Sequence, residues 1–218
     1  MLKLRTQEND IWFSSDFHYN HKNICSGITS WRLSDGTIPV NKVRDFKTLE
    51  LMNETIVNNI NNVVKQNDIL FHLGDWSFSG FESISSLYDR LVCKNIHLIL
   101  GNHDKMIEEN RNNIQSLFSS VSQYLEVMID EYTYVLSHYP FSSWNGLNKG
   151  WIHLHGHTHL NDKMKFGLGK RMDVGLDGNN LKPYNIKYDI VPLMNERTIK
   201  SELPFDHHTD EMKINMNN

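Results

Sequence analysis

Three short apolar runs, each ending in polar residues, constrain the fold of this chain most strongly. The runs lie at residues 11–15, 69–73 and 96–100. Their length and their content of aromatic and β-branched residues predict buried strands. Residues 46–65 and 81–93 carry apolar side chains every three or four positions, which predicts amphipathic helices. Strands that alternate with helices predict an α/β fold, in which ligands bind beyond the carboxyl ends of the strands.

The second half of the chain is richer in strand patterns. After a predicted helix at residues 105–118, apolar runs predict a hairpin around Asp130 and then two more strands. The predicted strands span residues 124–129, 132–136, 151–155 and 171–176. From residue 181 onward, Pro183 and Pro192 interrupt the pattern, and the sequence predicts no definite element there.

Length and composition indicate a soluble globular protein. A chain of 218 residues with 39% hydrophobic and 22% charged residues fits one domain, which we predict at residues 1–205. Residues 206–218 are polar and predict a flexible tail. Residues 22–44 predict an irregular insertion that suits substrate contacts.

Charge and targeting signals exclude several classes of protein. The net charge of −4 disfavours binding to extended duplex nucleic acid. No apolar run is long enough to cross a membrane, and the N-terminus does not resemble a signal peptide. Cys25 and Cys93 form no disulfide framework, so we expect a cytoplasmic protein. Nothing in the sequence indicates an oligomeric state.

The strand ends carry residues that can bind metals or transfer protons. These are Asp16, His18, Asp75, Asn102, His103, Asp104, His138, His157 and His159. Each alone has an ordinary explanation, such as a turn, a helix cap or a core histidine. Their common placement after apolar runs makes chance a poor explanation for the whole set.

The densest part of this pattern is the histidine run at residues 153–159. It holds four histidines in seven positions. Residues two apart in a strand project to the same side, so His157 and His159 can converge on one metal or on two adjacent metals. We interpret His153 and His155, which precede Gly156, as packing or backbone-bonded residues.

In this order, the motifs resemble the signature of the calcineurin-like metallophosphoesterases. The resemblance rests on Asp16-x-His18, Gly74-Asp75, Gly101-Asn102-His103-Asp104, His138 and Gly156-His157-x-His159. The first motif extends to His21, and Arg44-Asp45-Phe46 follows, as in a small, cap-free bacterial or phage branch. Asp45 departs from that pattern, in which a proline is expected. The resemblance implies a four-layer α/β/β/α sandwich of two mixed β-sheets flanked by helices.

The resemblance also implies a role for each matched residue. One metal would be bound by Asp16, His18 and His159, and the other by Asn102, His138 and His157. Asp75 would bridge the two metals. His103 would stand near the substrate, with Asp104 holding its imidazole, and this pair would be catalytic.

The chemistry of these residues agrees with such roles. Two carboxylates, four imidazoles and one amide leave two divalent ions with excess positive charge, which attracts a phosphoryl group and makes a bridging hydroxide available. That hydroxide would attack phosphorus in line. Mixed nitrogen and oxygen ligands favour manganese, iron, cobalt, nickel or zinc over magnesium or calcium, but they do not choose among these five. We expect two divalent transition-metal ions, with manganese as the first choice. A carboxylate beside His103 would raise the pKa of its imidazole. His21 and Arg44 are candidates for phosphate contacts.

The sequence leaves the substrate open. We favour a phosphodiester or a small nucleotide-like substrate, because aromatic residues stand near the strand ends and the chain has no room for a large cap. A phosphomonoesterase is the nearest alternative. A nuclease on short or single-stranded nucleic acid and a catalytically silent metal-binding scaffold are further alternatives.

Overall fold

Two five-stranded sheets form the centre of the protein. The computed structural model describes residues 1–25, 44–160 and 168–199. The first sheet has the order β1 (Leu2–Leu4), β6 (Tyr124–Ile129), β7 (Tyr132–Ser137), β8 (Ile152–His155) and β9 (Arg171–Asp173). The second has the order β10 (Tyr184–Asn185), β2 (Ile11–Ser14), β3 (Ile69–His72), β4 (Ile96–Ile99) and β5 (Ser120–Ser122).

Both sheets are mixed. In the first sheet β6 and β7 form the predicted antiparallel hairpin, and the other pairs are parallel. In the second sheet β2 to β5 are parallel, and only β10 runs antiparallel to its neighbour β2. The strands that carry the predicted motifs are therefore neighbours, and their carboxyl ends open on a common edge of each sheet.

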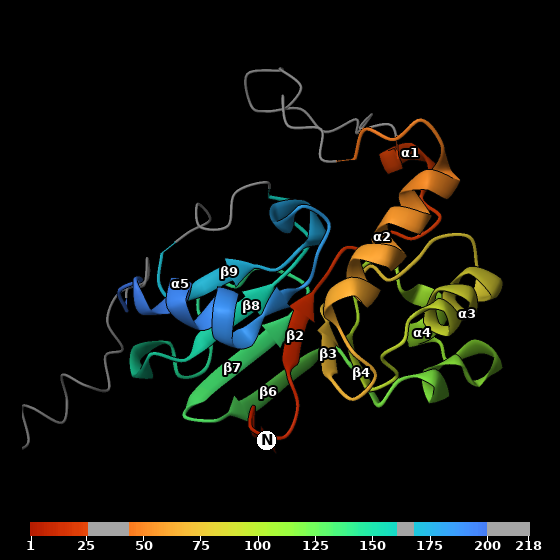
Figure 1. Cartoon of the computed structure of the whole chain (residues 1–218). Coiled ribbons are helices and arrows are strands. Elements are labelled where there is room, and N and C mark those ends of the chain that lie inside the picture. The colour runs from red at the N-terminus through yellow and green to blue at the C-terminus, as the bar shows by residue number, and fades with distance from the viewer. Residues whose placement is uncertain (26–43, 161–167, 200–218) are drawn as a thin grey trace, which may run out of the picture.

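The helices are shorter than the periodicity predicted. The α-helices are α1 (Lys22–Cys25), α2 (Leu49–Val63), α3 (Phe81–Arg90), α4 (Lys105–Glu108) and α5 (Val191–Asn195). The 3-10 helices are η1 (Arg111–Leu117), η2 (Leu147–Lys149) and η3 (Leu176–Asn179), and η4 (Ile186–Ile190) is a π-helix. Thr48 accepts a hydrogen bond from the backbone N–H of Leu51 and so caps the start of α2. Figure 1 shows α2 and α3 beside β3 and β4, on the side away from β6 and β7.

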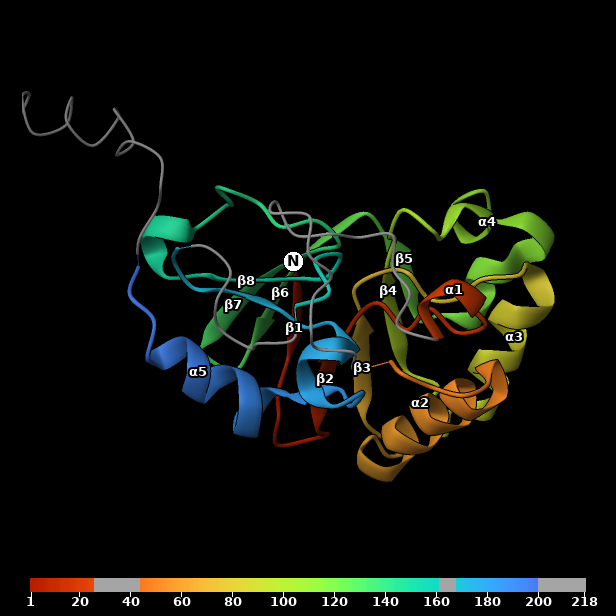
Figure 2. The ribbon, with the colours of Figure 1, turned by 90° about the horizontal axis from the view of Figure 1, so that it is seen from above.

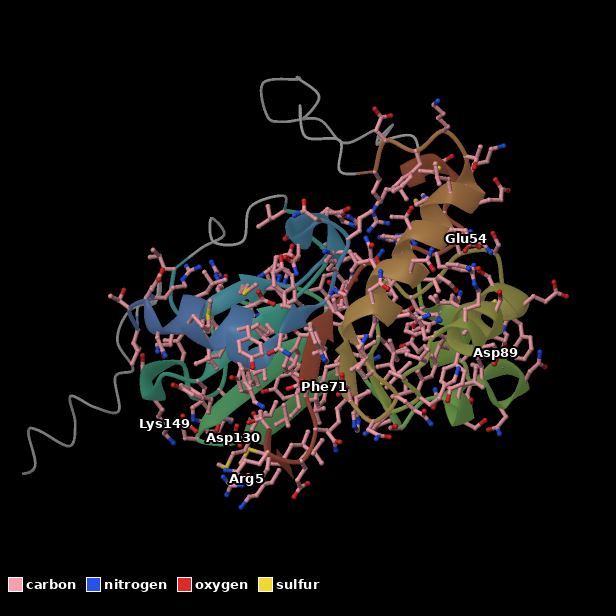
Figure 3. The ribbon with its side chains drawn as sticks, viewed as in Figure 1. Arg5, Glu54, Phe71, Asp89, Asp130 and Lys149 are labelled. Atoms are coloured by element: carbon pink, nitrogen blue, oxygen red, sulfur yellow. The ribbon has the colours of Figure 1, made fainter. Side chains whose placement is uncertain are left out.

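The main core lies between the two sheets. Ile11 and Phe13 of β2 point into it, and so do Leu136 of β7 and Leu154 of β8. Phe71, labelled in Figure 3, stacks on Phe13 with ring centroids 5.1 Å apart. A second core, which includes Met52 and Leu98, lies between the second sheet and its helices. Both faces of the central strands are thus buried. This explains why the sequences of these strands are nearly continuous apolar runs.

The predicted two-sheet fold is confirmed. Figure 2, seen from above, shows β6 to β8 on one side, β2 to β5 next to them, and α2 and α3 beyond. The far face of the first sheet carries a smaller cluster in which Trp144 and Leu147 pack on Val135. Within the described ranges, no helix is long and apolar enough to cross a membrane.

The structure contradicts one prediction about the elements, defines one segment that the sequence left open, and leaves two further predictions untested. The helix predicted at residues 105–118 is broken, because Asn110, Asn112 and Asn113 adopt the left-handed conformation that asparagine tolerates. The C-terminal segment, which the two prolines left undefined, forms β10, η4 and α5. Most of the predicted insertion at 22–44 and all of the tail at 206–218 lie outside the described residues.

Candidate metal centre

The predicted motifs meet at the carboxyl ends of strands from both sheets. Backbone hydrogen bonds tie the loops that follow these strands together. The Asp16 N–H donates to the Gly74 carbonyl at 2.9 Å, and the Gly156 N–H donates to the His138 carbonyl at 2.9 Å. The His157 N–H donates to the Asp16 carboxylate at 3.0 Å, which connects the two sheets. Residues from opposite ends of the chain are thereby brought into one cluster.

One half of the cluster consists of Asp16, His18 and His159. The Nε2 atoms of His18 and His159 lie 3.0 Å apart. The Asp16 Oδ1 atom lies 3.5 Å from His159 Nε2 and 3.8 Å from His18 Nε2. These three ligand atoms face one point, and their spacing suits a single metal ion.

The other half consists of Asn102, His138 and His157. His138 Nε2 lies 3.0 Å from the Asn102 Oδ1 atom, and the His138 and His157 rings are 5.1 Å apart. Asp75 stands between the halves, since its Oδ2 atom lies 3.6 Å from His18 Nε2 and 3.6 Å from His138 Nε2. The structure therefore brings together all seven residues that the sequence predicted as ligands.

Five of these seven residues have a positive φ angle, which is uncommon for residues other than glycine. The φ values are 56° for Asp16, 47° for His18, 61° for Asp75, 70° for His157 and 47° for His159. Strained backbone of this kind persists only where surrounding contacts enforce it, and it clusters at functional sites. The strained turns direct the side chains inward from five different loop positions.

The electrostatics of the cluster fit bound cations. Burial and the neighbouring Asp16 carboxylate raise the pKa of Asp75 to about 7. A pair of buried carboxylates needs positive charge nearby to remain ionised, and divalent cations supply it. Burial lowers the pKa of His18 well below its usual value, so its imidazole is neutral and can donate a lone pair. The donor set thus suits divalent metal ions.

Gly101 allows the loop after β4 to approach Asp75 closely. A Cβ atom at this position would lie 2.3 Å from Asp75 Oδ1 and 2.6 Å from its backbone nitrogen. No side-chain rotation relieves the second contact, because the nitrogen belongs to the backbone.

We therefore expect Gly101→Ala to destabilise the protein and weaken metal binding. Forcing a methyl group into this packed loop should cost about 1–3 kcal/mol. For a chain of this size the loss corresponds to roughly 2–12 °C in Tm. Thermal unfolding and metal content measured on the same samples test this. A variant that matches the unaltered protein in both would show that the close approach is unimportant.

His103 and Asp104 do not form the predicted pair. The His103 side chain is 41% exposed, and its Nε2 atom lies 3.9 Å from Asp75 Oδ2. Asp104 is buried, and its carboxylate accepts hydrogen bonds from the backbone N–H groups of Asp75, Trp76 and Gly101 at 2.8–2.9 Å. Asp104 thus positions the loops after β3 and β4, and it does not hold the His103 imidazole.

The expectation about the His103 pKa is also wrong. Burial and the nearby His138 lower the pKa of His103, and the opposing effect of the Asp16 carboxylate does not outweigh them. The His103 imidazole is nevertheless exposed at the edge of the cluster, as is that of His157.

Arg44 is placed differently from the phosphate contact that the sequence suggested. It is only 3% exposed, and its guanidinium donates to the Asp177 carboxylate at 2.7 Å and to the carbonyls of Asp16 and Phe17. These bonds direct the guanidinium into the protein, so the geometry favours a structural role. His21 is partly exposed, and its ring packs edge-on against Phe78 with ring centroids 3.7 Å apart.

Two acidic residues that the sequence reasoning missed support the cluster. Asp177 Oδ2 lies 2.5 Å from His159 Nδ1. Asp173 accepts hydrogen bonds from the Thr158 hydroxyl and from the Gly175 N–H. Asp173 lies inside the strand predicted at 171–176, and Asp177 directly follows that segment. An acidic residue at the end of a further predicted strand was the signal that could have revealed them.

His153 behaves as expected. Its Nδ1 atom is 3.0 Å from the Val135 carbonyl, and its Nε2 atom accepts a hydrogen bond from the Phe141 N–H. His155 is fully buried, with Nδ1 3.0 Å from the Gly156 carbonyl. The backbone turns at His157, whose φ angle is 70°, so the side-chain alternation of the strand does not continue to His159.

Fold and cluster together define an α/β protein with a metal centre built on strand ends. The sequence profile of the calcineurin-like phosphoesterases matches residues 10–188. The match covers most of the chain, and the chain belongs to this family. It is a metal-dependent phosphoester hydrolase.

The chain is also similar to individual proteins over most of its length. The chain is 33% identical to the uncharacterized protein MJ1445 of Methanocaldococcus jannaschii over 81% of its own length and 86% of that protein. It is 26% identical to the Gene 66 protein of Mycobacterium phage D29 over 89% of its length and 98% of that protein. Among solved structures, the protein of unknown function AQ665 from Aquifex aeolicus shares the fold. That match has a TM-score of 0.57 and 22% identity, and it covers 81% of this chain and 95% of the other.

Proposed function

We propose that the protein is a dinuclear phosphodiesterase that acts on small, nucleotide-like substrates. The position of Asp75 carries the dinuclear part of the proposal. Its Oδ2 atom is equally far, 3.6 Å, from a histidine of each half of the cluster. A carboxylate in this position can bridge two ions, and each half then supplies three further ligands. Two bound ions would lower the pKa of a shared water and offset the charge of phosphoryl oxygens.

The mixture of nitrogen and oxygen ligands indicates the kind of metal. Four imidazoles with carboxylate and amide oxygens suit first-row transition metals better than magnesium or calcium. Manganese is our first choice, and iron, zinc, nickel or cobalt would fit the same donor set.

The chain's own residues divide the work at such a site. Asp16, Asp75, His18 and His138 are buried and form its floor, whereas Asn102, His103 and His157 are exposed at its rim. A substrate can therefore reach the centre from the solvent on the rim side. His103 is the rim imidazole nearest Asp75 and is placed to donate a proton to the leaving oxygen.

His21 is placed to donate a hydrogen bond at the same rim. The Ile24 N–H donates to its Nδ1 atom at 3.1 Å. Since Nδ1 is an acceptor, the neutral imidazole must carry its hydrogen on Nε2. Burial and the nearby His103 lower the pKa of His21, which favours this neutral form. His21 thus offers one fixed donor to a phosphoryl oxygen.

Aromatic rings beside the rim histidines support a substrate that carries flat organic groups. Tyr139 is 47% exposed, and its ring centroid lies 4.8 Å from that of His157. Phe78 is half-buried, and its ring centroid lies 4.6 Å from that of His103. Aromatic side chains can stack on a base or another flat group. Trp76 and Trp144, by contrast, are buried in the cores.

A side-by-side assay tests the choice of substrate. With Mn²⁺ present, we expect a higher kcat/KM for bis-p-nitrophenyl phosphate than for p-nitrophenyl phosphate. The two compounds share a leaving group, so they differ only in the second ester. Faster turnover of the monoester would overturn the diester proposal and favour a phosphomonoesterase.

A further inference from the structure

Asp177 is a buried carboxylate to which the proposed reaction assigns no role. It lies in η3, directly after β9, and is 8% exposed. Its Oδ2 atom is 2.5 Å from His159 Nδ1, and its Oδ1 atom accepts a hydrogen bond from Arg44 Nε at 2.7 Å. The carboxylate therefore contacts a proposed metal ligand on one side and a buried cation on the other.

Arg44 extends this contact to a second ligand. Its Nη2 group donates to the Asp16 carbonyl at 2.5 Å, and its Nη1 group donates to the Phe17 carbonyl at 3.0 Å. Asp16 has a positive φ angle, so these bonds help to maintain a strained turn. The Asp177–Arg44 ion pair thus holds both Asp16 and His159, which come from different sheets.

The corresponding contact on the other half of the cluster is neutral. His138 Nδ1 is 2.8 Å from the Leu73 carbonyl, a backbone acceptor without formal charge. A carboxylate that accepts the second N–H of a ligating histidine fixes the ring and increases the basicity of the metal-binding nitrogen, and it does so more strongly than a neutral acceptor. The two halves therefore offer different support to their ions.

Asp177 is paired with a buried cation. Its Oδ1 atom lies 2.7 Å from Arg44 Nε, and the two side chains are only 8% and 3% exposed. A cation this close favours the charged form of the carboxylate that contacts His159.

We propose that Asp177, held by Arg44, is a positioning residue that makes the Asp16–His18–His159 half the tighter of the two metal sites. The inference rests on the proposed two-metal centre. It predicts two unequal Mn²⁺ affinities and assigns the tighter one to a specific half.

Titration of metal-free protein with Mn²⁺ tests the ranking. Isothermal calorimetry on the unaltered chain should give two equivalents with different Kd values. In Asp177→Asn, which keeps the size of the side chain but removes its charge, the tighter Kd should rise roughly 10–100-fold. The weaker Kd should change by less than about 2-fold. A substitution has little effect on a site with which it shares no contact partner. Asn102→Ala should instead weaken the second equivalent and leave the first in place.

Asp68→Asn is the matched control. Asp68 is also 8% exposed and accepts hydrogen bonds from Trp12 Nε1 and the Lys65 N–H, but it precedes β3 at the end opposite the cluster. Both Kd values should stay unchanged in this variant. Arg44→Lys provides a second test if Asp177→Asn does not fold. Lysine keeps the charge, but its single nitrogen replaces the three guanidinium nitrogens that contact Asp177 and the two carbonyls. It should weaken the same equivalent.

The outcomes separate this inference from the proposal beneath it. Two equivalents in the unaltered chain, with unchanged affinities in Asp177→Asn, would overturn the role of Asp177 and leave the dinuclear proposal standing. Equal weakening of both equivalents would overturn the ranking of the sites. A single equivalent in the unaltered chain would overturn the two-metal proposal and the inference together.

Discussion

Replacing Asp75 with asparagine is expected to remove at least one of the two proposed metal ions. Asp75 is 2% exposed, and its Oδ2 atom is the one closest to both halves of the cluster. Asparagine would lose the negative charge and offer only one oxygen, and its NH₂ group would face imidazole nitrogens or the incoming cation. We also expect turnover to fall by on the order of 10³-fold, since a metal contributes several kcal/mol to the stabilisation of transition-state charge.

Elemental analysis after gel filtration measures the metal retained by Asp75→Asn. Circular dichroism establishes that the variant is folded, which matters because Asp75 Oδ1 also accepts a hydrogen bond from the His103 N–H at 2.9 Å. Asp68→Asn again serves as a buried control that should keep its metals. Two ions at full occupancy in folded Asp75→Asn would contradict the bridging role.

His103→Ala is expected to retain metal and lose turnover. His103 belongs to neither proposed ligand set, so metal content should match that of the unaltered chain. Its imidazole is exposed above the cluster, and loss of a general acid typically reduces kcat by roughly 10²–10⁴-fold. This result would also exclude a catalytically silent scaffold, because turnover would then depend on a specific side chain.

The leaving group distinguishes proton donation from simple phosphate binding. A p-nitrophenolate departs with little need for a proton, so His103→Ala should be least impaired with bis-p-nitrophenyl phosphate. The loss should grow with a diester of unsubstituted phenol, whose leaving oxygen is more basic. An equal loss with both substrates would assign His103 to phosphate binding, and unchanged turnover with both would remove it from the mechanism.

The fold was largely predictable because its central strands are buried on both faces. Residues 11–15, 69–73 and 96–100 are mostly apolar for this reason, and they form β2, β3 and β4 with small changes at their ends. The edge strands β1, β5 and β10 were missed, since strands of two or three residues leave too short a pattern. The helix at 105–118 failed because asparagines can leave the helical conformation at low cost.

The sequence by itself determined which residues carry the chemistry. Aspartate, asparagine and histidine follow apolar strands at matching places, and parallel strands necessarily bring their carboxyl ends to one edge. Residue type and position at the strand ends indicated a cluster able to bind metal, and the resemblance to the calcineurin-like metallophosphoesterases selected the seven candidate ligands that the structure brings together.

Only the tertiary structure decided how those residues are held. Side-chain alternation predicts direction within a strand, but Asp16, Asp75 and His159 lie just beyond strands, where positive φ angles redirect them. The contact between Asp177 and Arg44 joins positions 133 residues apart, and no local pattern encodes such a pair. Spacing along a chain records local geometry alone, whereas the supports of a buried site depend on which loops pack together after the sheets have formed.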